Sequence, residues 1–289
     1  MSLLRKIGVL AGWMFLELAV LFLGVVAVNE VMLKPALGLL PLSEEIARSI
    51  RYALSIAVAF GLYVAAVRLI ERKRCTELSP TGMGREAILG FGGGFLALSV
   101  ILGILALLGA YRILGMNPLA PMLPMMILIF LLALIEELAF RGILYRRIEA
   151  EFGTLAALLF SAAIFGVLHM TNDNANLVMV LSAALGGAFI GLFYTLTRRL
   201  WIPIFFHFAW NLAQLTWGTR VSGAEEFDTL VAAELAGPDW LTGGEAGPEN
   251  SVITIVMLVA IIAVSWRAAS KRGKLIPPRH VVRQDPICG

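Results

Sequence analysis

Long apolar blocks separated by short polar segments dominate the pattern of this chain. Several blocks hold about 20 mostly apolar residues, the length that a helix needs to cross the ~30 Å hydrocarbon core of a bilayer. The pattern predicts eight membrane-spanning helices, at residues 7–28, 50–70, 87–110, 122–146, 154–170, 177–197, 202–219 and 251–267. We therefore predict an all-α, polytopic membrane helix bundle around a polar cavity, and we expect this cavity to open toward the cytoplasm or the inner leaflet.

Composition agrees with a membrane protein. Hydrophobic residues make up 59% of the chain and charged residues 15%, whereas soluble globular proteins have roughly 45–50% and about 25%. The net charge of +3 does not indicate a nucleic-acid partner, because the basic residues lie at the ends of the apolar blocks, as membrane orientation requires. The first block is longer than the apolar region of a signal peptide, so we predict a retained helix.

The distribution of Lys and Arg predicts the orientation. With a cytoplasmic N-terminus, 17 of these residues fall on the cytoplasmic side and five on the other side. This bias favours a cytoplasmic location for both termini, which requires an even number of spans. The cysteines, Cys75 and Cys288, would both lie on the cytoplasmic side, where a structural disulfide is unusual.

The chain divides into four regions. We assign residues 1–120 to the first three spans, 121–219 to a core of four spans, 220–250 to an extracytoplasmic loop, and 251–289 to the last span and a basic cytoplasmic tail. The loop has seven acidic residues and one Arg. We interpret it as solvated, with a short amphipathic helix around 224–236; a lid that captures substrate is the alternative. We expect the tail to lie on the inner leaflet or to be disordered.

Small residues recur at helical spacing in two of the predicted spans. Ala183, Gly187 and Gly191 follow one another every fourth residue, and glycines crowd positions 90–94. Such patterns allow two helix backbones to approach closely in lipid. They indicate packing and carry no information about chemistry.

Few ionisable groups fall within the predicted spans, and each is a functional candidate because burying a charge in lipid is expensive. Glu137 and Arg141 are four residues apart on one helix and can pair. Glu136 points about 100° away from Glu137 and has no local partner. Burial of such a carboxylate favours its protonated form and suits a general base. His207 and Asn211, also four apart, share one helix face, and His169 ends the fifth span.

Each group also has a structural interpretation. The two glutamates and Arg141 would form a buried ion network, His169 would bond to a backbone carbonyl, and His207 with Asn211 would join two helices. Glu17 in the first span either faces a cavity, pairs with a polar neighbour, or is buried and protonated. Two carboxylates, an Arg, two His and an Asn on three spans are nevertheless difficult to explain as unrelated features.

The order and spacing of these residues resemble those of a known family. Three motifs occur in sequence: Glu136-Glu137-x-x-x-Arg141, Phe165-x-x-x-His169 and His207-x-x-x-Asn211. They are similar to the motifs of the CPBP family of intramembrane endopeptidases, which includes type II CAAX prenyl proteases and bacteriocin-processing and immunity (Abi) relatives. The resemblance covers about residues 120–218.

This resemblance implies proteolysis within the membrane without a Ser or Cys nucleophile. Glu136 would be the general base that activates water, with help from His169. His207 and Asn211 would stabilise the oxyanion, while Glu137 and Arg141 would support the site. No cofactor is favoured, but Glu136, His169 and His207 are also suitable ligand types for a zinc site.

The expected partners are membrane lipid and a peptide or protein substrate, lipidated or not. The expected location is the cell membrane of a bacterium or archaeon. Three functions remain open: a glutamate-type or zinc-dependent endopeptidase, a non-catalytic scaffold or immunity protein of the same fold, and a proton-coupled transporter. Buried Glu and His residues also serve as proton relays.

Overall fold

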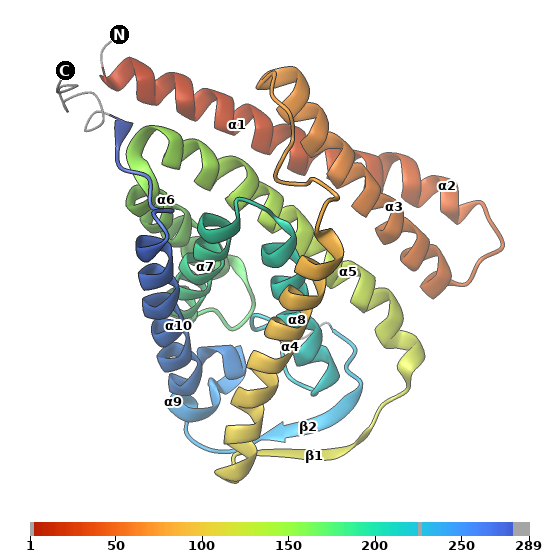
Figure 1. Cartoon of the computed structure of the whole chain (residues 1–289). Helices are drawn as coiled ribbons and strands as arrows, with labels where there is room; N and C mark the ends of the chain where they lie inside the picture. The colour runs from red at the N-terminus through yellow and green to blue at the C-terminus, as the bar shows by residue number, and fades with distance from the viewer. Residues whose placement is uncertain (1–2, 225–226, 280–289) are drawn as a thin grey trace.

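The computed structural model describes residues 3–224 and 227–279, and its main elements are long helices (Figure 1). The α-helices, of which α2 and α9 are short, are α1 (Leu3–Ala27), α2 (Lys34–Gly38), α3 (Glu44–Ala65), α4 (Met83–Leu107), α5 (Leu119–Glu137), α6 (Arg146–Leu168), α7 (Leu177–Thr197), α8 (Trp201–Thr216), α9 (Asp239–Thr242) and α10 (Val252–Lys271). Two short strands, β1 (Tyr111–Met116) and β2 (Val231–Leu235), pair with each other. The prediction of an all-α membrane bundle is confirmed.

The predicted spans correspond to helices of the structure. Within the described residues, six helical segments are long and apolar enough to cross a membrane. One of them extends from Leu119 to Thr171 and covers two predicted spans. Gly153 breaks this segment with non-helical backbone angles. The remaining predicted span corresponds to α8, which has 16 residues and is not among these six segments.

Helical structure also extends where a long connection was expected between the first two spans. A π-helical turn, Val28–Leu33, joins α1 directly to α2, so the helix continues to Gly38. The spans predicted at 7–28 and 50–70 left residues 29–49 as a connection, and this is wrong for residues 29–38 and also for residues 44–49, which belong to α3. Helix α3 then starts after Ser43, whose hydroxyl accepts a hydrogen bond from the Ile46 amide at 3.4 Å.

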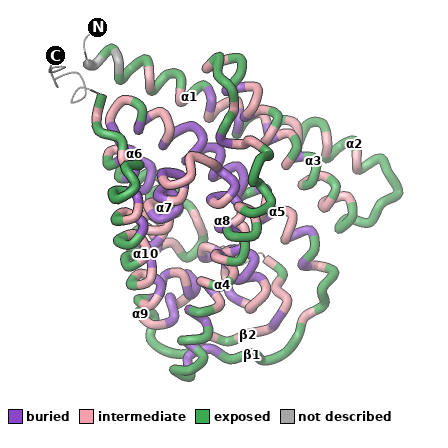
Figure 2. Tube along the Cα trace, viewed as in Figure 1, coloured by how far each residue is buried: buried purple, intermediate pink, exposed green. Residues whose placement is uncertain are grey.

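The outward faces of the bundle are apolar. Side chains such as Phe15, Leu23, Ile88 and Leu107 are largely exposed. Figure 2 shows that the buried positions gather toward the centre of the molecule, while the outer sides of α4 and α10 are exposed. A soluble protein rarely exposes so much contiguous apolar surface. These faces are suited to contact with lipid.

Glycines make the closest helix contacts. A Cβ added to Gly90 would lie 2.8 Å from the Ile202 carbonyl oxygen, and one on Gly94 would overlap the carbonyl oxygen of Phe206. On α7, a Cβ on Gly191 would lie 3.0 Å from Leu158. The predicted role in packing is confirmed for these glycines, which lie where α4 contacts α8 and α6 contacts α7, but not for Gly92, where a Cβ would meet nothing within 4 Å.

The segment 220–250 is folded rather than a solvated loop. Its strand β2 pairs antiparallel with β1, from Tyr111 opposite Leu235 to Met116 opposite Val231. The prediction of an amphipathic helix around 224–236 is wrong, because residues 231–235 form this strand; residues 225–226 lie outside the described part. Pairing with β1 satisfies backbone groups that a single strand would leave open.

The start of the basic tail packs against the bundle. At Gly153, where φ is +81°, the chain leaves room for the backbone of residues 276–278. The Thr154 amide donates to the Ile276 carbonyl at 2.9 Å, and the Ile276 amide donates to the Thr154 hydroxyl at 2.8 Å. The start of the tail therefore packs against α6, so the alternative of disorder does not hold for it, while a location at the inner leaflet stays a prediction. Residues 280–289, which include Cys288, lie outside the described part.

Candidate active site

The carboxylates at the end of α5 lie where the helix changes its hydrogen-bonding pattern. Residues Leu138–Tyr145 form a π-helical segment directly after Glu137, and all eight are buried. Such π-helical turns inside helices are frequent at functional sites. This segment places Arg141 within reach of both Glu137 and the neighbouring helix α7.

Glu137 and Arg141 form a fully buried ion pair. Arg141 donates from Nη1 to Glu137 Oε1 at 2.7 Å and from Nη2 to the Gly187 carbonyl at 2.8 Å. The exposed fractions are 0% for Glu137 and 1% for Arg141. The pair predicted from the four-residue spacing therefore forms, and it ties the end of α5 to α7.

His207 lies between the two glutamates. Its Nδ1 donates to Glu137 Oε1 at 2.9 Å, and its Nε2 lies 3.7 Å from Glu136 Oε2. Among the described residues, no hydrogen bond reaches Glu136 Oε2. Since Nδ1 is held by a carboxylate, the orientation of the ring is defined, and Nε2 is the nitrogen left for chemistry.

His169 is oriented by its own helix. Its Nδ1 donates to the Phe165 carbonyl at 2.8 Å, which leaves Nε2 as the free ring nitrogen. The Phe165 ring packs against the His169 ring, with centroids 4.6 Å apart, and against the His207 ring at 6.2 Å. The Arg141 guanidinium lies 5.3 Å from the same phenyl centroid. Phe165 thus fixes three of the candidate groups in relation to one another.

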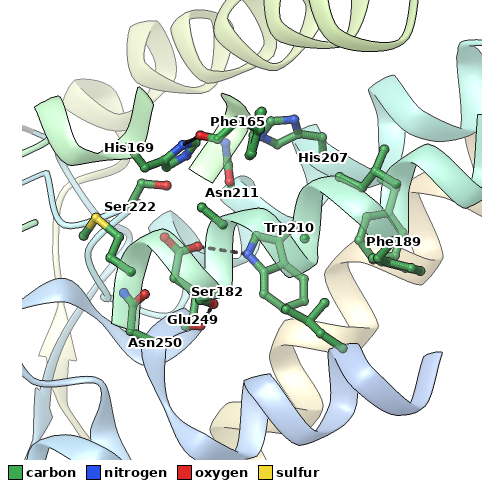
Figure 3. A pocket seen from close by; sticks show the side chains of 16 residues that line it. Phe165, His169, Ser182, Phe189, His207, Trp210, Asn211, Ser222, Glu249 and Asn250 are labelled. Atoms are coloured by element: carbon green, nitrogen blue, oxygen red, sulfur yellow. Dashed lines mark hydrogen bonds between the residues drawn. The ribbon is translucent and has the colours of Figure 1, made fainter. Parts of the chain in front are cut away.

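A cavity brings three of the predicted site residues together: His169, His207 and Asn211 (Figure 3). Its remaining walls are mostly apolar, with contributions from α6, α7, α8 and α10. Glu136 is not among the lining residues and approaches the cavity through His207 Nε2. The six predicted residues therefore form one connected group, but they do not all face one point.

The cavity also contains residues that sequence reasoning did not single out. Ser222, Glu249 and Asn250 from the segment 220–250 line it. Glu249 is one of seven acidic residues in that segment, and nothing in its sequence context distinguishes it from the others. The cavity therefore adjoins the acidic segment, which the Lys and Arg distribution predicts to be extracytoplasmic, whereas an opening toward the cytoplasm or the inner leaflet was also expected.

The metal alternative finds no ready ligand set. Among the described residues, no group of three or more His, Cys, Asp or Glu side chains lies close enough together to hold a metal ion. The zinc set considered from the sequence, Glu136, His169 and His207, does not form such a group. His207 Nδ1 is already hydrogen-bonded to Glu137, so only its Nε2 could bind a metal ion.

Glu17 has a structural partner. It is 1% exposed, and its Oε2 accepts a hydrogen bond from Arg147 Nε at 2.7 Å. Of the alternatives drawn from the sequence, pairing with a polar neighbour is the one the structure shows. This ion pair joins α1 to α6 and lies apart from the cavity.

The candidate site lies within the part of the chain that matches a known protein family. Residues 118–213, from α5 to α8, match the type II CAAX prenyl endopeptidase Rce1-like family. This stretch contains all six site residues predicted from the sequence and covers about a third of the chain. The resemblance to the CPBP family is therefore confirmed over this segment: the chain is a polytopic membrane protein whose residues 118–213 are similar to type II CAAX prenyl endopeptidases.

A particular relative has a similar segment. Over 78 residues the chain is 33% identical to the putative membrane peptidase YdiL of Bacillus subtilis strain 168. The aligned part is 27% of this chain and 30% of that protein. No solved structure matches the chain.

Proposed function

We propose that this protein is an intramembrane endopeptidase that hydrolyses a peptide bond near the membrane by activating water with a glutamate. Glu136 is the general base, assisted by His169, and His207 and Asn211 bind the oxyanion. Glu137 and Arg141 hold His207 in position. The proposal rests on the family match over α5–α8 together with the geometry around His207.

The observation that carries the proposal is a chain of polar contacts that is buried as far as His207 and ends at the partly exposed Glu136. It runs from the Gly187 carbonyl through Arg141 and Glu137 to His207, and then to Glu136. A carboxylate that holds one imidazole nitrogen leaves the other oriented toward substrate, which is the arrangement that proton-transfer catalysis requires. A structural ion network would not need a second carboxylate without a hydrogen bond at the far end of the chain.

The geometry suggests the order of events. Glu136 takes a proton from water as the water attacks the scissile carbonyl, and the resulting carboxylic acid returns that proton to the leaving amine. The oxyanion of the tetrahedral intermediate accepts hydrogen bonds from His207 Nε2 and the Asn211 amide. Because Nδ1 of His207 already donates to Glu137, this role requires the imidazolium form, which alone has N–H groups on both nitrogens.

The first experiment is a cleavage assay with quenched-fluorescence peptides, with and without a prenyl group. Purified protein should cut a subset of these peptides. Glu136→Gln should lower kcat by at least about 100-fold, the lower end of what a general base contributes. The control is Glu30→Gln, which should keep full activity. Glu30 is an exposed residue of the first helical segment, where it pairs with Lys34.

The chelator arm of this assay addresses metal dependence. Under the metal-free mechanism, activity persists in the presence of a strong chelator. Loss of activity with the chelator, restored by zinc, would overturn that mechanism in favour of a zinc peptidase. Full activity in Glu136→Gln would remove Glu136 from the role of base, and no cleavage of any peptide by the unmodified protein would favour a scaffold.

A further inference from the structure

The wall of the cavity contributed by the segment 220–250 carries a carboxylate that the proposed mechanism does not use. Glu249 Oε2 accepts hydrogen bonds from the indole N–H of Trp210 and from the side-chain amide of Gln214, both at 3.1 Å. The backbone carbonyl of Glu249 accepts a hydrogen bond from the Ser182 hydroxyl. Contacts with α7 and α8 therefore hold Glu249 against the cavity (Figure 3).

The acceptors at this wall are incompletely used. Among the described residues, no hydrogen bond reaches Glu249 Oε1, and no Lys, Arg or His lies within ion-pair distance of this carboxylate. Asn250 is 3% exposed, and its Nδ2 donates to the Ala246 carbonyl at 2.9 Å. Its Oδ1 is buried without a partner within the same part of the chain and belongs to a residue that lines the cavity.

The buried Asn250 Oδ1 is costly without a donor, and the partly buried Glu249 carboxylate would be stabilised by a cation. Apart from the site residues, much of the cavity lining is apolar and includes Phe189, Ile190 and Leu258. A side chain that combines an apolar stem with a charged end fits such a space, and Lys and Arg have this form. The chemistry of the wall is therefore complementary to a basic side chain.

We propose that Glu249 and Asn250 form a specificity subsite that binds the ammonium or guanidinium group of a basic residue in the peptide substrate. This inference rests on the proposed peptidase function, because His169, His207 and Asn211 line the same cavity. A peptide anchored at Glu249 would extend past the two histidines. The segment 220–250 thereby acts in substrate recognition.

The test measures binding separately from cleavage. The full-length chain with Glu136→Gln is mixed with fluorescein-labelled peptides of apolar residues that contain one Lys, Arg, norleucine or Glu. The Lys and Arg peptides should bind at least about tenfold more tightly than the norleucine peptide. Norleucine has no charged group, so it leaves the Glu249 carboxylate without a partner. Adding Glu249→Gln should abolish this difference and leave the affinity for the norleucine peptide unchanged.

Two further variants make the result specific. A glutamine at position 249 can still accept hydrogen bonds from Trp210 and Gln214, so the fold should persist, and its thermal unfolding is checked. Glu249→Lys should reverse the preference toward the Glu peptide. Glu234→Gln, a change in an exposed residue of β2, should keep the preference for basic peptides.

Each outcome decides between the two proposals. Equal binding of basic and norleucine peptides, or a uniform loss for all peptides in Glu249→Gln, overturns the subsite. A preference for basic peptides that depends on Glu249, in a chain whose unmodified form cuts no peptide, supports the subsite while the peptidase function fails. Cleavage of peptides without any preference for basic residues supports the peptidase function and overturns the subsite.

Discussion

At the scale of single residues, the pair Glu137–Arg141 carries the largest energetic consequence. Both side chains are fully buried and each also bonds to a third group, His207 or Gly187. Removing one partner of a buried pair leaves an uncompensated charge, whereas removing both charges does not. His207 thus depends on Arg141 without touching it.

We expect Arg141→Met to lower the free energy of unfolding by about 3–5 kcal/mol, because Glu137 is left buried with His207 alone. The double variant Glu137→Gln with Arg141→Met should recover part of this loss. Thermal unfolding in detergent, read by intrinsic fluorescence, measures both. Lys34→Met breaks an exposed pair with the same four-residue spacing and should leave the unfolding temperature unchanged; equal effects in the two variants would contradict the argument.

A second residue-scale prediction concerns Cys75, which is free and half-buried beside Glu77 in the segment between α3 and α4. Burial, followed by the charge of Glu77, raises the pKa of the Cys75 thiol to about 12. The thiolate is the reactive form, and a raised pKa lowers its fraction at pH 8. Reaction should therefore be slow at pH 8 and accelerate as the pH rises.

The measurement uses the Cys288→Ser variant, so that only Cys75 can react. Maleimide labelling of the folded protein at pH 8 should be slower than labelling in denaturant by a factor of at least about 100, because the raised pKa leaves little thiolate. Glu77→Gln should accelerate the reaction. Labelling at the denatured rate would show that the thiol is neither buried nor influenced by Glu77.

At the scale of elements, the seam between α4 and α8 positions His207 and Asn211. Gly90 and Gly94 let α4 approach the backbone of α8 at residues 202–206, directly before His207. Without a hydrophobic driving force between helices in lipid, close backbone packing is a main source of association. The geometry of the site therefore depends on a helix contact that contributes no side chain to the proposed chemistry.

Gly94→Ala should destabilise this seam, because its methyl group would overlap the Phe206 carbonyl, and it should also lower peptidase activity by displacing α8. Gly92→Ala on the same helix is the matched control, since a Cβ there meets nothing within 4 Å. Thermal unfolding and cleavage are measured for both. Similar unfolding temperatures for the two variants would show that α4 and α8 are less closely packed than described.

At the scale of the whole molecule, the orientation of the bundle decides from which side substrate reaches the cavity. The Lys and Arg distribution predicts cytoplasmic termini. The acidic segment, which contributes Glu249 and Asn250 to the cavity, would then lie on the opposite side of the membrane. A substrate would be recognised at the extracytoplasmic end of the bundle.

This orientation is tested by single cysteines in a background that lacks Cys75 and Cys288. A cysteine at the exposed position Glu245 should react with a membrane-impermeant maleimide in intact cells. One at Arg272, exposed after α10, should react only after the membrane is opened. The reverse pattern would place the cavity on the cytoplasmic side.

The sequence by itself determined the membrane bundle, the positions of its spans and the residues of the three motifs. The apolar blocks needed no tertiary information, because the thickness of the bilayer sets the length of a spanning helix. The ion pair Glu137–Arg141 could also be predicted without tertiary information, because residues four apart on a helix are neighbours. Roles of the motif residues in catalysis remain predictions.

Only the tertiary structure decided which groups share the cavity. The contact of His207 with both glutamates depends on how α8 packs against α5, and the place of Glu249 depends on how the segment 220–250 folds back over the bundle. Seven acidic residues in an apparent loop have the same local pattern as a solvated surface. Contacts between residues distant in sequence carry no periodic signal, so no helix or strand pattern distinguished Glu249 from its neighbours.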